Sequence, residues 1–189
     1  MSYYTDIQAL FKEFEENNDI FLKKGLIVLS YNKSEIVICF NAIADKTAIA
    51  QTTNNENNVF IFLKKKYFKK YHFLKKVYKK ELLNEVVLHE LVHAVQHIKN
   101  KYELNQFYFL EDYWEIPQEV EAYTLVLLQR IKKEKYNEAI KYLEVEYPEF
   151  AKKLNFKKFL KKAEKWGVPT KRLNEFIKYY REYLLVAEQ

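Results

Sequence analysis

Cysteine, glycine and proline are all scarce in this chain of 189 residues. It has one cysteine, two glycines and three prolines. The lone Cys39 can form no internal disulfide, which agrees with a reducing compartment. The shortage of glycine and proline leaves no stretch with the composition of a flexible linker. Because the length also suits a single hydrophobic core, we expect one domain over residues 1–189.

Long apolar runs are lacking as well. No stretch approaches the 18 apolar residues expected of a membrane-spanning helix. The first residues lack the basic and then apolar pattern of a signal peptide. We therefore expect a cytoplasmic protein without a membrane partner. Apolar residues still make up 49% of the chain and aromatic residues 17%, which is enough to build a core and argues against disorder.

Arginine is rare among the basic residues, since only three of the 32 lysines and arginines are arginine. The net formal charge of +6 therefore rests on lysine, which reads base edges poorly compared with arginine. Nine lysines fall within residues 64–80, interleaved with aromatic and aliphatic residues. We interpret this segment as an amphipathic helix with a solvated lysine face. The alternative is a surface for an acidic or nucleic-acid partner.

Hydrophobic periodicity predicts an α+β chain. A first helix is expected over residues 6–16, ended by the polar run 17–19. Two hairpins should follow and form a small, mostly antiparallel sheet. Further helices are expected in the second half, several of them beginning at a proline or a capping residue. The predicted strands are 25–31, 35–40, 47–52 and 58–63, and the later helices are 82–98, from 117, 131–146, 147–166 and from 170.

The motif His89-Glu90-x-x-His93 lies inside the apolar pattern of residues 82–98. Two histidines four residues apart share one helix face, so both imidazoles can reach one metal ion with Glu90 beside them. A chain of this composition would contain the motif by chance in roughly one case in a hundred. In a zinc peptidase the metal lowers the pKa of its bound water, and the glutamate takes the proton. A pair of hydrogen-bonded core histidines is the alternative interpretation.

A catalytic zinc site needs a third protein ligand, and the predicted helix that starts at Pro117 contains two candidates. It carries Glu119, Glu121 and Ala122 before an apolar run. The H-E-x-x-H motif followed by such a helix resembles the gluzincin class of zinc metallopeptidases, in particular the small intracellular ImmA/IrrE-like proteases with an E-x-x-A-N second motif. The resemblance covers residues 89–128. By position it implies that Zn²⁺ is bound by His89, His93 and Glu119, with Glu90 as the general base.

The sequence does not decide the roles of several residues around this ligand set. Glu121 is the alternative third ligand, although it lies about 200° around the helix from Glu119. The family has Asn or Asp four residues after the ligand, where this chain has Tyr123. Tyr123 and Tyr113 are candidates for orienting a ligand or for donating a hydrogen bond to the oxyanion. His97 is not expected to be a ligand, because a continuous helix places it about 12 Å along the axis from His89.

The resemblance implies a zincin-like fold, with the sheet and the motif helix at about 1–99 and a helical half at about 117–189. The expected function is hydrolysis of peptide bonds in a protein or peptide substrate that adds a strand to the sheet edge. Two alternatives remain. One is a catalytically silent binding or regulatory protein on this scaffold. The other is a protease that acts on nucleic-acid-bound proteins, which the lysine-rich segment suggests.

Overall fold

The computed structural model describes residues 3–41, 49–55, 58–65, 76–99 and 116–187. The chain divides into two compact units, Met1–Gln106 and Phe107–Gln189. The division falls between the two parts that the sequence predicts, and their membership of a single domain stays a prediction. None of the helices in the described ranges has an apolar stretch suited to crossing a bilayer.

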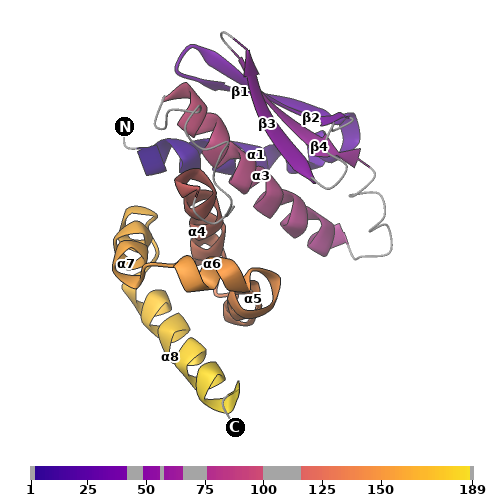
Figure 1. Ribbon diagram of the computed structural model, residues 1–189. Helices are drawn as coiled ribbons and strands as arrows, with labels where there is room; N and C mark the ends of the chain where they lie inside the picture. The colour runs from indigo at the N-terminus through magenta and orange to yellow at the C-terminus, as the bar shows by residue number, and fades with distance from the viewer. Residues whose placement is uncertain (1–2, 42–48, 56–57, 66–75, 100–115, 188–189) are drawn as a thin grey trace. The chain divides into compact units, whose positions relative to one another are not determined.

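The first unit combines helices with a four-stranded sheet of order β1-β2-β4-β3 (Figure 1). Both predicted hairpins are present, because β1 pairs with β2 and β3 pairs with β4 in antiparallel fashion. The two hairpins join through a parallel pairing of β2 with β4. The α+β class is therefore confirmed, while the sheet is mixed. Its elements are α1 (Tyr3–Lys24), β1 (Leu26–Tyr31), β2 (Ser34–Asn41), β3 (Ala50–Asn55), β4 (Asn58–Lys64) and α3 (Lys76–Ile98).

Strand composition explains the parallel pair. The apolar strand β4 has the sequence Asn-Val-Phe-Ile-Phe-Leu-Lys, whereas β3 reads Ala-Gln-Thr-Thr-Asn-Asn. An apolar strand is favoured in the centre of a sheet and a polar strand at its edge. Placing β4 beside β2 satisfies both preferences, and the direction of β4 then makes the contact parallel. The sequence signals for the two hairpins do not show that β2 pairs with β4.

One face of the sheet packs on the two helices α1 and α3 (Figure 1). The strands alternate strictly there, with Val59, Ile61 and Leu63 of β4 buried and the residues between them half-buried. Ile36 and Ile38 of β2 face the same way and are fully buried. This alternation is the period-two pattern of a sheet with one covered face. It places the motif helix directly beneath β3 and β4.

The first helix is longer than predicted, because α1 runs through the polar residues 17–19 to Lys24. Asn18 is buried, and its side-chain amide donates a hydrogen bond to Asn84 of α3 at 3.3 Å. Phe21 on the next turn is fully buried. The helix ends at Lys24 and is followed by Gly25, whose φ of +78° favours glycine. A tertiary contact thus outweighs the local tendency of asparagine to end a helix.

The prediction of one lysine-faced helix over residues 64–80 is wrong at the start of this range. Lys64 belongs to β4, and Lys76 to Lys80 belong to the first turns of α3. Residues 66–75 lie outside the described ranges. A partner bound through this segment stays a prediction.

The second unit is helical throughout its described range, as expected for this half. Predicted helix 147–166 is broken, because Leu154 is extended and Asn155 caps a new helix by accepting a hydrogen bond from the backbone N–H of Lys158 at 3.0 Å. Gly167, at φ +67°, follows the buried Trp166 at the end of that helix. The elements are α4 (Pro117–Lys132), α5 (Tyr136–Lys141), the π-helical turn η3 (Tyr142–Glu146), α6 (Pro148–Lys153), α7 (Phe156–Lys165) and α8 (Thr170–Ala187).

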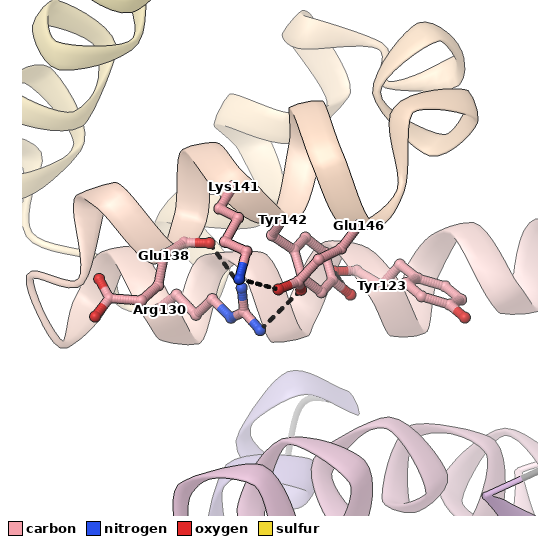
Figure 2. A network of polar contacts seen from close by, with 6 residues as sticks. All are labelled: Tyr123, Arg130, Glu138, Lys141, Tyr142 and Glu146. Atoms are coloured by element: carbon pink, nitrogen blue, oxygen red, sulfur yellow. Dashed lines mark hydrogen bonds and ion pairs between the residues drawn. The ribbon is translucent and has the colours of Figure 1, made fainter. Parts of the chain in front are cut away.

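Arg130 of α4 holds the short elements α5 and η3 in place (Figure 2). Its guanidinium lies over the ring of Tyr142, 4.4 Å from the centroid, and donates to the backbone oxygen of Glu138 at 2.7 Å. It also pairs with Glu146 at 3.4 Å, and Lys141 approaches the same carboxylate at 3.9 Å. Arg130 therefore serves the packing of this unit.

A buried charge links three elements of the first unit. Asp6 of α1 is 8% exposed and accepts hydrogen bonds from Lys99, which follows α3, at 2.6 Å and from Tyr31 of β1 at 2.8 Å. Burial acts to raise the pKa of Asp6, but the hydrogen bonds from Lys99 and Tyr31 outweigh burial and lower that pKa below its ordinary value of 3.8. The end of the motif helix is thereby tied to both neighbours.

We predict that Asp6→Asn lowers the free energy of unfolding by about 1–3 kcal/mol at pH 7, because Lys99 loses its charged partner. A lowered pKa in the folded state means that this contribution is present above the ordinary value and is lost as pH falls through the folded-state pKa. The difference in the free energy of unfolding between variant and parent should therefore become smaller as the pH falls from 5 to about 2. Denaturant unfolding at both pH values measures this difference.

Glu16→Gln on the same helix is the matched control, since Glu16 is 64% exposed and pairs only with Lys12 among the ion pairs described for it. Its effect should stay within about 0.5 kcal/mol. An Asp6→Asn effect of the same size at both pH values would contradict the assignment of the buried charge.

Candidate metal centre

The motif histidines lie on α3, among buried apolar residues. Leu88, Leu91, Val92 and Val95 are fully buried, so the helix is embedded in the core of the first unit. Its sequence carries no glycine or proline, which allows an unbroken helix. His89 and His93 sit one turn apart, and both are half-buried. Polar side chains on such a helix need compensating partners, because leaving them unpaired in the core costs several kcal/mol.

The two imidazoles converge. Nε2 of His89 and Nε2 of His93 are 3.1 Å apart, with ring centroids at 4.8 Å and ring planes at 76°. Two nitrogen ligands at about 2.0–2.1 Å from a tetrahedral zinc ion are about 3.3 Å apart. The observed separation is close to that value, so the pair fits two corners of such a site. A hydrogen-bonded pair of core histidines would give a similar contact, which makes metal titration the discriminating measurement.

Gln96 defines the tautomer of His93. It is buried, and its Oε1 lies 3.0 Å from Nδ1 of His93. An amide oxygen only accepts hydrogen bonds, so Nδ1 carries the proton and Nε2 presents a lone pair. Metal-ligating histidines have this arrangement, in which the second nitrogen donates to an outer acceptor. A cation bound at the pair would occupy the place of any proton between the two Nε2 atoms.

Glu90 lies beside the pair and is bound to the sheet edge. It is 8% exposed, and the hydroxyl of Thr52 donates to its Oε2 at 2.6 Å. The same hydroxyl lies 3.3 Å from the backbone oxygen of Glu90. Thr52 belongs to β3, which among the described strands pairs only with β4 and so forms an edge of the sheet. The Glu90 carboxylate is therefore held at a fixed position beside this edge strand.

The two candidate third ligands differ in their surroundings within the second unit. Glu121 is 2% exposed and lies 3.9 Å from Nζ of Lys162 on α7. Glu119, in the first turn of α4, is half-buried. The side chain of Glu121 is thus directed into its own helical unit, while Glu119 lies on a different face of α4. This favours Glu119 over Glu121 as a ligand.

The remaining candidates have other environments. The ring of Tyr123 packs against Tyr147, with centroids 4.6 Å apart, and against Phe150 at 5.8 Å. Its role near a metal stays a prediction, and Tyr113 lies outside the described residues. His97 is half-buried, and burial followed by repulsion from His93 lowers its pKa. Within the described part of the chain its Nδ1 makes no hydrogen bond.

Sequence reasoning missed Thr52 and Gln96. Gln96 follows His93 by three residues on one helix, a spacing that brings two side chains together and could have identified it. Thr52 comes from a strand 38 positions away in the sequence. Nothing in a polar edge strand marks one threonine among several, so only the fold connects Thr52 with Glu90.

The chain was compared with known protein families, with curated proteins and with solved structures, and it matches none of them. The resemblance to gluzincins therefore stays a prediction from the residues of the two motifs.

We predict that Gln96→Leu weakens zinc binding by about 10- to 100-fold, because Nδ1 of His93 loses its acceptor and the ring loses its orientation. Competition against a chromogenic chelator measures the affinity. Gln96→Glu keeps an acceptor at the same place and should restore binding to within a few-fold of the parent. Equal affinity of the leucine variant and the parent would remove Gln96 from the metal centre.

Proposed function

We propose that the protein is a zinc-dependent metallopeptidase with a zincin-like fold. The observation that carries the proposal is the pair of imidazoles whose Nε2 atoms lie 3.1 Å apart, with the buried carboxylate of Glu90 in the intervening turn. A histidine pair with an adjacent glutamate on one helix is the arrangement of the H-E-x-x-H zinc peptidases, in which the glutamate acts as general base. A purely structural metal site has no need of a base.

The proposed ligands are His89, His93 and Glu119. Each is half-buried and offers one ligand atom, and the resemblance implies these three by position. Two neutral imidazoles and one carboxylate are a common catalytic zinc set, because three protein ligands leave the fourth position open. Glu119 is preferred over Glu121 because Glu121 is buried against Lys162.

Bound zinc would supply Lewis acidity and a water molecule whose pKa is lowered to about 7. The residues of this chain would transfer the proton and position the reacting groups. Glu90 accepts the proton of the attacking water and delivers it to the nitrogen of the leaving amine. Gln96 keeps His93 in the correct tautomer, and Thr52 fixes the position of the Glu90 carboxylate.

The substrate is proposed to be an extended peptide that adds a strand at β3, an edge of the sheet among the described strands. Its backbone groups would pair with β3, so binding would depend on main-chain hydrogen bonds and little on sequence. Because Thr52 lies on β3 and bonds Glu90, a chain bound at this edge would pass close to the proposed base.

We predict that Glu90→Gln lowers the rate of cleavage of a denatured protein substrate by about 100- to 10,000-fold, because glutamine cannot accept a proton. Zinc stoichiometry should stay unchanged, since Glu90 is not a ligand. A fluorescence-quenched casein substrate measures the rate. Glu85→Gln on the same helix is the control and should cleave at the parental rate.

Two results would overturn the peptidase proposal. Full activity in the Glu90→Gln protein would exclude a base role for that residue. Zinc binding without cleavage of any denatured substrate by the unaltered protein would favour a catalytically silent scaffold.

The choice of third ligand has its own test. We predict that Glu119→Gln weakens zinc binding by at least about 100-fold, because it removes a charged ligand, whereas Glu121→Gln retains the metal. Equilibrium dialysis with metal analysis gives the stoichiometry. The reverse result, loss of zinc in Glu121→Gln alone, would assign that residue as the ligand instead.

A further inference from the structure

The outer face of the sheet is the face opposite the helices α1 and α3 (Figure 1). Successive residues of a strand point to opposite faces, so the residues between the buried positions of β1, β2 and β4 belong to this outer face. In a sheet with one solvated face these residues are usually polar, whereas strands covered on both faces are apolar throughout. Here β2 contains the run Ile-Val-Ile-Cys-Phe and β4 contains the run Val-Phe-Ile-Phe-Leu. Both strands therefore have the composition of strands covered on both faces.

The strand register arranges six residues of the outer face in two rows across three strands. The first row is Val28, Val37 and Phe60, and the second row is Leu26, Cys39 and Phe62. The rings of Phe60 and Phe62 stack with their centroids 6.0 Å apart. On β3 the same rows continue with the polar residues Thr53 and Gln51. The six residues form one contiguous apolar surface, which we call the outer patch.

Solvent reaches the outer patch. Leu26 is 50% exposed, Val28 is 43% exposed, and the other four residues are half-buried. On the inner face, by contrast, Ile36, Ile38 and Ile61 are fully buried. An apolar surface that is contiguous and exposed is typical of an interaction site. We therefore looked for the partner whose charge and shape fit this face.

The outer patch is uncharged in a chain whose net formal charge is +6. No charged residue occurs in its two rows. Two copies of a basic chain repel each other, so they approach most readily through a face without charge. Charged residues of the outer face flank the patch at its two ends. Glu35 lies two residues before Val37 on β2, and Lys64 lies two residues after Phe62 on β4. Because β2 and β4 are parallel, these opposite charges lie at opposite ends of the patch.

A two-fold axis that runs across the strands makes the outer patch complementary to itself. It places the first row of one copy over the second row of the other, so apolar side chains meet apolar side chains. It also brings Glu35 of each copy to the end where the other copy has Lys64. An axis along the strands would instead place apolar β1 over polar β3. The charge pattern therefore favours a second copy of this chain, packed with its strands antiparallel to those of the first.

The size of the face sets the expected strength of the contact. Four strands about 4.8 Å apart and about 20 Å long present a face of about 400 Å². A stable complex typically buries about 800 Å² on each partner, and weaker, reversible complexes bury less. The sheet face thus suits a reversible dimer that forms at micromolar concentrations.

We propose that the outer patch is a dimerisation surface, on which a second copy of this chain packs its own outer patch to form a two-sheet sandwich. The inference does not depend on the peptidase proposal. His89, Glu90 and His93 belong to α3, which packs on the inner face, so dimerisation would leave the sheet edge at β3 and these residues uncovered by the second copy.

Sedimentation velocity of the complete chain tests the oligomeric state. Between about 5 and 500 µM, in about 0.15 M salt, the protein should pass from monomer to dimer with a dissociation constant of about 10–100 µM. A single monomeric species over the whole range would overturn the proposal and leave the patch to a different partner.

A charge placed on the exposed part of the patch should prevent the contact. Val28→Lys should weaken dimerisation by at least about tenfold, because the lysine would be buried against apolar residues of the second copy. Ile20→Lys is the matched control, since Ile20 is 47% exposed and lies on α1 at the inner face. It adds the same charge and should leave the dissociation constant within about twofold of the parent. Equal weakening by the two variants would overturn the proposal.

Cys39, the single cysteine, reports directly on the patch. Its side chain lies in the second row and would be covered in the dimer. Its rate of reaction with a maleimide should fall as the protein concentration rises, with the midpoint found by sedimentation. In Val28→Lys the rate should stay at the monomer value. A dimer with unchanged Cys39 reactivity would place the contact elsewhere, for example at the edge of β1, and would overturn the proposal.

The antiparallel arrangement has a separate test. Glu35→Lys should weaken dimerisation by about threefold to tenfold, because lysines of the two copies would then approach each other. Adding Lys64→Glu to this variant reverses both charges and should restore most of the lost affinity. A double variant that dimerises no better than Glu35→Lys alone would contradict the proposed orientation.

Discussion

The need to compensate two imidazoles and a carboxylate on a helix embedded in apolar packing shapes the first unit. His89, Glu90 and His93 lie among fully buried leucines and valines of α3. Each has a defined partner. The Nε2 atoms of the two histidines lie in contact, Oε1 of Gln96 lies beside Nδ1 of His93, and the hydroxyl of Thr52 donates to the Glu90 carboxylate. Thr52 reaches the Glu90 carboxylate because β3 packs on α3.

The elements that the sequence predicted well are those with strong local signals. Strand patterns predicted both hairpins, although β3 runs from Ala50 to Asn55 and not over 47–52. Apolar residues at helical spacing predicted α3 and α4. The same periodicity correctly separated Glu119 from Glu121 on different faces of α4. What it could not supply was the pairing of Glu121 with Lys162, because that contact joins residues 41 positions apart through the packing of two helices.

The predictions that were wrong concern features set by contacts between residues far apart in the sequence. Residues 17–19 look like a helix end, yet Asn18 is buried and bonded to Asn84, so a tertiary contact continues α1. The parallel contact of β2 with β4 depends on which strand is apolar enough for the centre of the sheet, a property of the whole set of strands. In the helical unit, Asn155 caps a new helix where apolar periodicity suggested continuity.

X-ray absorption at the zinc edge, on the purified protein loaded with one equivalent of zinc, addresses the metal centre most directly. A site built by the histidine pair predicts a first shell of nitrogen and oxygen atoms at about 2.0–2.1 Å, with the outer-shell scattering of two imidazoles. In a His89→Ala variant, the outer-shell scattering of one of the two imidazoles should be lost. No tightly bound zinc, or a first shell without imidazole, would contradict a metal centre at His89 and His93 and leave their contact as a hydrogen bond of the core.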